Sequence, residues 1–124
     1  MTRPTVLVVD DEPLITNMLS MILDLGLDAE IITTNSPVEA RDLILNRPVS
    51  LLVTDYLMPE FNGLQLVRTI RERGFLLPVL LLTGYCDEPE LAANNERLKP
   101  FEIIVKPWDN EHLIRRINFL LGKT

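Results

Sequence analysis

The chain has 124 residues, of which 47% are hydrophobic and 24% are charged, and its formal net charge is −6. This length and composition fit one globular domain with its own hydrophobic core, and they exclude a disordered chain. The acidic balance argues against direct nucleic-acid binding through bulk electrostatics. The single cysteine, Cys86, excludes an intrachain disulfide.

Targeting and membrane signals are missing from the sequence. The first residues lack the layout of a signal peptide, and no apolar run approaches the roughly 18 residues that cross a bilayer. We therefore expect a cytoplasmic protein without membrane insertion.

Five short apolar runs predict β-strands. The first, third and fourth are nearly continuous in Val and Leu, which is typical of strands buried on both faces of a parallel sheet. The second is mixed in polarity and fits an edge strand. The runs are Thr5–Val9, Ala29–Thr33, Val49–Thr54, Pro78–Leu82 and Phe101–Val105.

Helix signals separate the runs. Pro13 predicts the start of a helix that ends at Gly26, because proline suits the first helical position and glycine the end. Its apolar residues predict one inward stripe, consisting of Leu14, Ile15, Met18, Leu19, Ile22 and Leu23.

Three further helices have recognisable starts or ends. Ser36 with Glu39 and Asn62 with Gln65 have the spacing of capping boxes. The second of these helices is expected to end near Gly74, and Asp109 can cap a last helix. The segment Asp87–Pro100 is a weaker helix candidate, because it is short and poorly amphipathic.

Strict alternation of strands and helices predicts an α/β fold, a doubly wound parallel sheet with helices on both faces. Either a flavodoxin-like or a Rossmann-like arrangement satisfies the pattern. In both arrangements ligands bind outside the carboxyl ends of the strands.

Polar residues follow four of the expected strands at that edge. Asp10 and Asp11 follow the first strand, Asp55 the third, Thr83 the fourth and Lys106 the fifth. Because these ends share one edge, we expect a cluster of carboxylates with a hydroxyl and an ammonium. Carboxylates about 4 Å apart repel by roughly 4 kcal/mol at an effective dielectric near 20. A divalent cation such as Mg²⁺ relieves this repulsion, and an aspartate can then attack phosphorus.

The spacing of these motifs resembles the receiver domain of two-component response regulators. The motifs are Val8–Glu12, Asp55–Pro59 with Gly63, Leu82–Gly84 and Val105–Pro107. The resemblance covers about Thr5 to Leu121. It implies a flavodoxin-like five-stranded sheet of order 2-1-3-4-5, and one receiver domain across residues 1–124 with no output domain.

The resemblance also implies a metal site. Asp11 and Asp55 would ligate Mg²⁺ through their side chains, and Leu57 would do so through its backbone carbonyl. Asp10 would act mainly through metal-bound water, whereas Glu12 would only tune the local field. Mn²⁺ can substitute for Mg²⁺.

Phosphoryl chemistry follows from the same resemblance. Asp55 would accept a phosphoryl group from a phosphohistidine of a histidine kinase or histidine phosphotransfer protein. Thr83 and Lys106 would bind the phosphoryl oxygens, with Lys106 aimed by a cis bond to Pro107. The protein would assist its own phosphorylation and dephosphorylation in two-component or phosphorelay signalling, without being an enzyme with a separate substrate.

Signal output would use the face formed by the fourth helix, fifth strand and fifth helix. Its partners would be a downstream output protein or domain, and a phosphorylation-dependent homodimer is possible. The family often has an aromatic residue at the position of Ile103, which moves as the signal passes. Tyr85 or Trp108 could substitute for that ring.

Two alternatives remain. Ile103 and the unusual segment Asp87–Pro100 favour a receiver-like module that binds partners without phosphorylation. A small aspartate-dependent phosphatase is disfavoured, because Leu57 stands where such enzymes carry a second acid.

Overall fold

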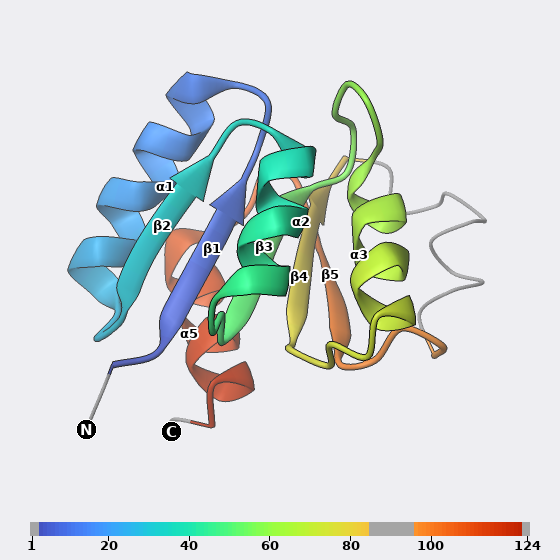
Figure 1. Cartoon of the computed structure of the whole chain (residues 1–124). Helices are drawn as coiled ribbons and strands as arrows, with labels where there is room; N and C mark the ends of the chain where they lie inside the picture. Colours follow the sequence, from blue (N-terminus) through green and yellow to red (C-terminus); the bar gives the residue numbers. More distant parts are fainter. Residues whose placement is uncertain (1–2, 85–95, 123–124) are drawn as a thin grey trace.

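A computed structural model describes residues 3–84 and 96–122. These residues form five strands and four helices, which alternate from β1 to β4 (Figure 1). The weaker helix expected between Asp87 and Pro100 lies largely outside the described residues. The elements are β1 Thr5–Val9, α1 Pro13–Gly26, β2 Glu30–Thr34, α2 Pro37–Asn46, β3 Leu51–Asp55, α3 Gly63–Glu72, β4 Val79–Thr83, β5 Phe101–Val105 and α5 Asn110–Leu120.

The strands form one parallel sheet of order β2-β1-β3-β4-β5. This order confirms the flavodoxin-like prediction and the assignment of the second strand to an edge. The ends of β2, β3 and β4 differ from the expected ones by one or two residues. In particular, β3 extends to Asp55, which pairs with Leu82 of β4. Asp55 is therefore fixed by the sheet rather than by a loop.

Helices cover both faces of the sheet, α1 and α5 on one and α2 and α3 on the other (Figure 1). Successive residues of a strand point to opposite faces. Val6 and Val8 accordingly pack in the layer of α1 and α5, whereas Leu7 and Val9 pack in the layer of α2 and α3. Both faces of β1 are fully covered, which explains its continuous run of apolar residues.

The inward stripe predicted for α1 is partly wrong. Leu14 is 81% exposed and Met18 40% exposed, whereas Leu19, Leu23 and Thr16 are buried. Apolar residues occupy two neighbouring columns of this helix, and only one column can face the sheet. Although α1 exposes apolar side chains, no helix among the described residues is long and apolar enough to span a membrane.

Gly26 is the last residue of α1, as predicted. A Cβ at this position would lie 2.4 Å from Cδ1 of Ile114. The missing side chain therefore lets the end of α1 approach α5 closely.

The predicted helix starts are present. Asn62 and Gln65 form a complete capping box, with 2.8 Å from the Gln65 amide to Asn62 Oδ1 and 2.7 Å for the reciprocal bond. Ser36 accepts a bond of 3.2 Å from the Glu39 amide, and Asp109 caps α5. These caps fix where α2, α3 and α5 leave the loops at the carboxyl edge of the sheet.

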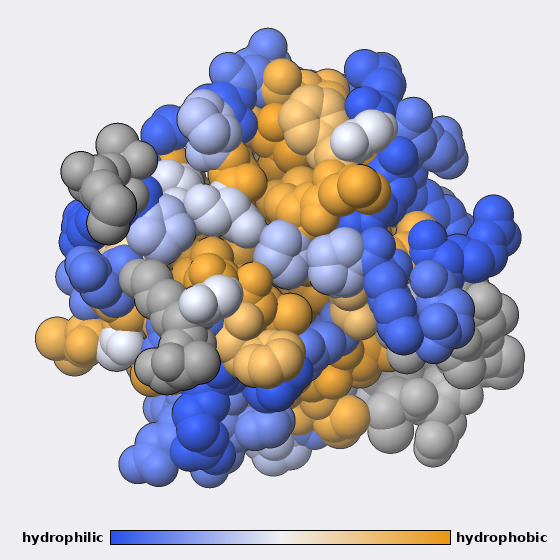
Figure 2. All heavy atoms as spheres, turned by 90° about the horizontal axis from the view of Figure 1, so that it is seen from below, coloured by the Kyte–Doolittle hydropathy of each residue, from blue (hydrophilic) through white to orange (hydrophobic). Residues whose placement is uncertain are grey.

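The opposite edge of the sheet, seen from below in Figure 2, has apolar side chains across its middle and hydrophilic ones around its rim. A hollow of about 650 Å³ lies there, and its two arginines are paired. Arg47 lies 3.2 Å from Glu30, and Arg3 lies 3.8 Å from Asp28. Both arginines of this hollow are thus engaged in ion pairs, and the candidate site residues lie at the other edge of the sheet.

Substitution of Gly63 by alanine should lower the free energy of unfolding by about 2–3 kcal/mol, measured by urea denaturation. A Cβ there would lie 2.3 Å from the Asp55 carbonyl oxygen and 2.7 Å from Leu81 Cδ1. Because the nearest atom belongs to the backbone of β3, the strand itself would have to shift to accommodate the methyl group. Gly84→Ala is the matched control, because a Cβ at Gly84 meets nothing within 4 Å. Equal stabilities of the two variants would contradict this packing argument.

Candidate functional site

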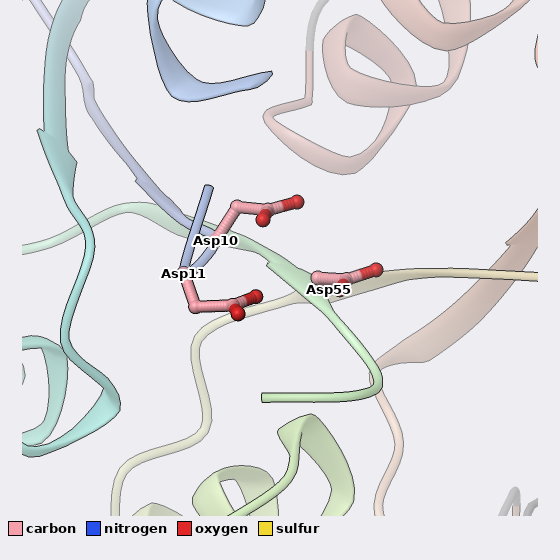
Figure 3. Close-up of side chains that lie close together, drawn as sticks. All are labelled: Asp10, Asp11 and Asp55. Carbon is pink, nitrogen blue, oxygen red and sulfur yellow. The ribbon is translucent and has the colours of Figure 1, made fainter. Parts of the chain in front are cut away.

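Three aspartates meet at the carboxyl edge of the sheet (Figure 3). Asp10 and Asp11 follow β1, and Asp55 ends the adjacent strand β3. One oxygen from each carboxylate lies within 4.8 Å of the others. The predicted convergence of these three side chains is therefore correct.

Asp11 and Asp55 line a cleft of about 540 Å³ that also contains the other expected groups, and the Asp10 carboxylate lies behind them. Thr83 is 1% exposed and Leu57 is 52% exposed. The cleft therefore combines buried polar groups with an exposed apolar side chain at its mouth. Its lining consists of Asp11, Glu12, Asp55, Tyr56, Leu57, Thr83, Gly84 and Lys106.

Lys106 is the cation of the cleft. Its Nζ donates to Asp55 Oδ1 at 2.5 Å. The end of β5 holds it in place, because the Lys106 amide donates to the Thr83 carbonyl at 2.9 Å. The Lys106–Pro107 bond is cis, as expected.

The backbone around Asp55 is fully engaged. Thr54 Oγ1 donates to the Asp55 carbonyl at 2.9 Å, and the Tyr56 amide donates to the Leu82 carbonyl at 3.0 Å. The Gly63 amide then donates to the Tyr56 carbonyl at 2.7 Å. These bonds leave the Asp55 side chain, 8% exposed as a residue, directed into the cleft from a rigid strand end.

Asp10 is the most deeply buried of the three carboxylates, at 2% exposure. Burial raises its pKa to about 6, and repulsion from Asp55 and Asp11 adds to that effect. The Glu12 amide, which donates to Asp10 Oδ1 at 2.9 Å, and the charge of Lys106 act in the opposite direction. The site thus destabilises the charged form of Asp10.

The charges of the cleft suit a divalent cation. Three ionised carboxylates and one ammonium leave two net negative charges in a small volume. Mg²⁺ prefers carboxylate and carbonyl oxygens together with water, and the site offers three carboxylates. Asp10, Asp11 and Asp55 fit such an ion as a donor set, and the cleft also contains Leu57, whose carbonyl remains a predicted ligand.

Four further residues were given roles in the sequence analysis: Glu12, Ile103, Trp108 and Tyr85. Glu12 is exposed, and its amide rather than its carboxylate supports Asp10. Ile103 packs in the layer of α2 and α3, whereas Trp108 packs in the layer of α1 and α5. Trp108 therefore does not take the position of a ring at Ile103, and Tyr85 lies outside the described residues.

Two residues with a role in the site were missed in the sequence. Asn35 Nδ2 donates to the Asp10 carbonyl at 2.9 Å and to Thr16 Oγ1 at 3.0 Å. Thr16 stands on the buried side of α1, where its hydroxyl interrupts an otherwise apolar column. That interruption was the available signal, and Asn35 also follows β2 at the edge that carries the site.

A family model described as the response regulator receiver domain matches residues 6–118. The hydrogenase transcriptional regulatory protein HoxA of Cupriavidus necator is 36% identical over 112 residues, which are 90% of this chain and 23% of HoxA. The transcriptional regulatory protein TdiR of Thauera aromatica is 31% identical over 118 residues, which are 95% of this chain and 51% of TdiR. The chain thus spans about a quarter to a half of these relatives.

Solved structures show the same likeness. A response regulator receiver domain protein from Clostridium thermocellum has a TM-score of 0.85 and 26% identity, covering 96% of this chain and 94% of that one. The chemotaxis protein CheY4 of Vibrio cholerae has a TM-score of 0.84 and 25% identity, covering 96% of this chain and 99% of that one. Both matches extend across nearly the whole sheet and its covering helices.

Asp10→Asn should stabilise the metal-free protein at pH 7 by about 2–3 kcal/mol, and this gain should vanish near pH 4. The pKa of Asp10 rises from 3.8 to about 6 on folding, so the folded state binds the proton more tightly. The contribution of Asp10 to stability is therefore lost as the pH rises from about 4 to 6. Urea denaturation of both proteins in EDTA measures the difference, and a gap that does not change with pH would contradict it.

Proposed function

We propose that this chain, which belongs to the response regulator receiver domain family, is a phosphoryl-accepting switch in which Asp55 takes the phosphoryl group. One observation carries the proposal: Asp55 clusters with the Asp10 and Asp11 carboxylates and lines one cleft with Asp11 and Lys106, whose ammonium contacts it. The donor is a phosphohistidine on a sensor kinase or phosphotransfer protein. The switch has no substrate apart from its donor, itself and water.

Phosphoryl transfer depends on positioning and charge neutralisation. An oxygen of Asp55 forms a bond to phosphorus while the donor's phosphorus–nitrogen bond breaks, and that electron pair stays on the imidazole nitrogen. Lys106 holds the Asp55 carboxylate before transfer and pairs with a phosphoryl oxygen afterwards. Thr83, at the end of the next strand, donates its hydroxyl to another. Mg²⁺ held by Asp10, Asp11 and Asp55 would supply a Lewis acid that offsets negative charge during the transfer.

A partner that delivers the phosphoryl group must reach the cleft beside the start of α1. The exposed face of this helix carries Leu14, Met18, Met21 and Leu25, and three of these are more than two-thirds exposed, at 81%, 69% and 88% for Leu14, Met21 and Leu25. Their spacing of four, three and four residues is the seam that packs against another helix in a coiled coil. The donor surface that fits this face is therefore helical and apolar.

The output surface is proposed on β5 and α5. Glu102 of β5 and Arg116 of α5 form two hydrogen bonds of 2.9 and 2.6 Å, and the Arg116 guanidinium lies 4.6 Å from the centre of the Phe119 ring. Phe119 is 62% exposed and Val105 44% exposed. Because Val105 adjoins Lys106, a shift of that lysine onto a phosphoryl group reaches this surface directly. A downstream protein, domain or second copy of the chain reads the change here.

The alternative is a module that binds its partners without phosphorylation. Ile103 supports it, because an aliphatic side chain stands in the layer of α2 and α3 where the family often carries an aromatic ring. The intact acidic cluster and its lysine favour the phosphoryl acceptor instead.

With Mg²⁺ and acetyl phosphate, the wild-type protein should gain one phosphoryl group, and Asp55→Asn should gain none. The amide lacks the nucleophilic oxygen anion that forms the acyl phosphate. Intact mass spectrometry counts the added group, and cleavage by hydroxylamine identifies it as an acyl phosphate.

Asp42→Asn is the control, because Asp42 is an exposed carboxylate of α2 outside the cleft. It should be labelled like the wild type. Equal labelling of Asp55→Asn would reject Asp55 as the acceptor, and an unlabelled wild type would favour the phosphorylation-independent module.

Met21→Glu should slow transfer from a phosphorylated kinase or phosphotransfer protein by about tenfold, because a charge in an apolar contact costs at least about 1.4 kcal/mol. Labelling by acetyl phosphate should not change, since Met21 lies outside the cleft. Leu76→Glu is the control, because Leu76 is 68% exposed but precedes β4. Equal transfer rates for the two variants would exclude α1 from the docking surface.

A further inference from the structure

The loop that carries Asp10 and Asp11 is tied at both of its ends. At one end, the Asp10 carbonyl accepts a hydrogen bond of 2.9 Å from Asn35 Nδ2. At the other end, Thr16 Oγ1 donates to the Pro13 carbonyl at 3.1 Å. The same Asn35 amide reaches Thr16 Oγ1 at 3.0 Å and thus joins the two ends. Asp11 lies between them.

We infer that Asn35 and Thr16 are positioning residues for the divalent cation, holding Asp10 and Asp11 in the conformation in which they meet Asp55. This inference rests on the function proposed above, because it assumes that the aspartates bind a metal. Neither side chain belongs to the cleft or the acidic cluster. They act through the backbone.

Repulsion explains why such a tie is needed. Three carboxylates that place oxygens within 4.8 Å of one another favour any motion that separates them. Asp55 cannot move, since it is the last residue of a central strand. The loop after β1 is the part that could open, and a loop that opens must close again at a cost before it can bind a cation.

The other bonds of this loop do not link its start to α1. The Glu12 carbonyl accepts from the Ile15 and Thr16 amides at 3.0 and 3.2 Å, which closes the first turn of the helix. The Asp10 amide donates to the Thr34 carbonyl at 3.3 Å, which continues the pairing of β1 with β2. The Glu12 amide donates to Asp10 Oδ1 at 2.9 Å, a bond within the loop itself. Only the Asn35 side chain joins the loop, among the described residues, to both the neighbouring loop and the first turn of α1.

Packing alone does not explain why a polar residue occupies position 16. It is 2% exposed and lies on the side of α1 that also buries Leu19 and Leu23. Apolar residues would fill such a column more favourably, since a buried hydroxyl costs free energy unless it is hydrogen-bonded. Its hydroxyl satisfies this condition by donating to Pro13 and accepting from Asn35.

Asn35→Ala should weaken metal binding by about tenfold, as is typical when a residue that orients metal ligands is removed. Free Mn²⁺, counted by its electron paramagnetic resonance signal, gives the dissociation constant, and competition gives that of Mg²⁺. Thr16→Val should weaken binding in the same direction, and Thr16→Ser, which keeps the hydroxyl, should stay within about twofold of the wild type.

Asn46→Ala is the matched control. Asn46 Nδ2 also donates to a backbone carbonyl, that of Asp42 at 2.7 Å, but at the far end of α2. Its metal affinity should equal that of the wild type. All proteins are compared at a temperature at which circular dichroism finds every variant folded, so that a loss of affinity cannot come from unfolding.

The outcomes separate this inference from the proposed function. If the wild type binds Mn²⁺ and both Asn35→Ala and Thr16→Val bind it equally well, the positioning role is overturned and the proposed function stands. If the wild type does not bind the ion, the proposed function fails, and the inference fails with it.

Discussion

Repulsion among three carboxylates at one edge of the sheet is the constraint on which the rest of this protein depends. Asp10, Asp11 and Asp55 come close because parallel strands end at a common edge, and the central position of β1 and β3 prevents them from moving apart. One lysine offsets part of the charge, and burial raises the pKa of Asp10 to about 6. The folded state therefore contains a concentration of negative charge that a bound divalent cation would offset.

Different parts of the structure hold the different residues of this site. Asp55 is held by the sheet and by the close approach of Gly63, whereas Lys106 is held by the continued pairing of β5 with β4. The aspartates after β1 depend instead on a loop with side-chain ties from Asn35. Rigid elements thus hold the proposed acceptor Asp55 and the ammonium of Lys106, whereas a loop holds Asp10 and Asp11, the other two proposed metal ligands.

Sequence patterns predicted the parallel sheet and the residues that meet at its edge, because buried parallel strands and residues at their ends leave strong local signals. The strand order came only from the resemblance to receiver domains, since the patterns alone also fit a Rossmann-like arrangement. The choice between the two apolar columns of α1 was not predictable in this way, since Leu14 and Leu19 are equally apolar and only packing decides which is buried. The role of Asn35 was not predictable from the sequence for a related reason. Its role depends on a contact between loops separated by 25 positions in the chain, and an asparagine after a strand is ordinary in a turn.

The most direct test of this account is anomalous diffraction from crystals of the protein soaked in Mn²⁺. We expect an anomalous peak in the cleft, from a Mn²⁺ ion coordinated by side-chain oxygens of Asp11 and Asp55 and by the Leu57 carbonyl. A cleft without a peak, or a bound ion whose ligands do not include Asp55, would contradict it.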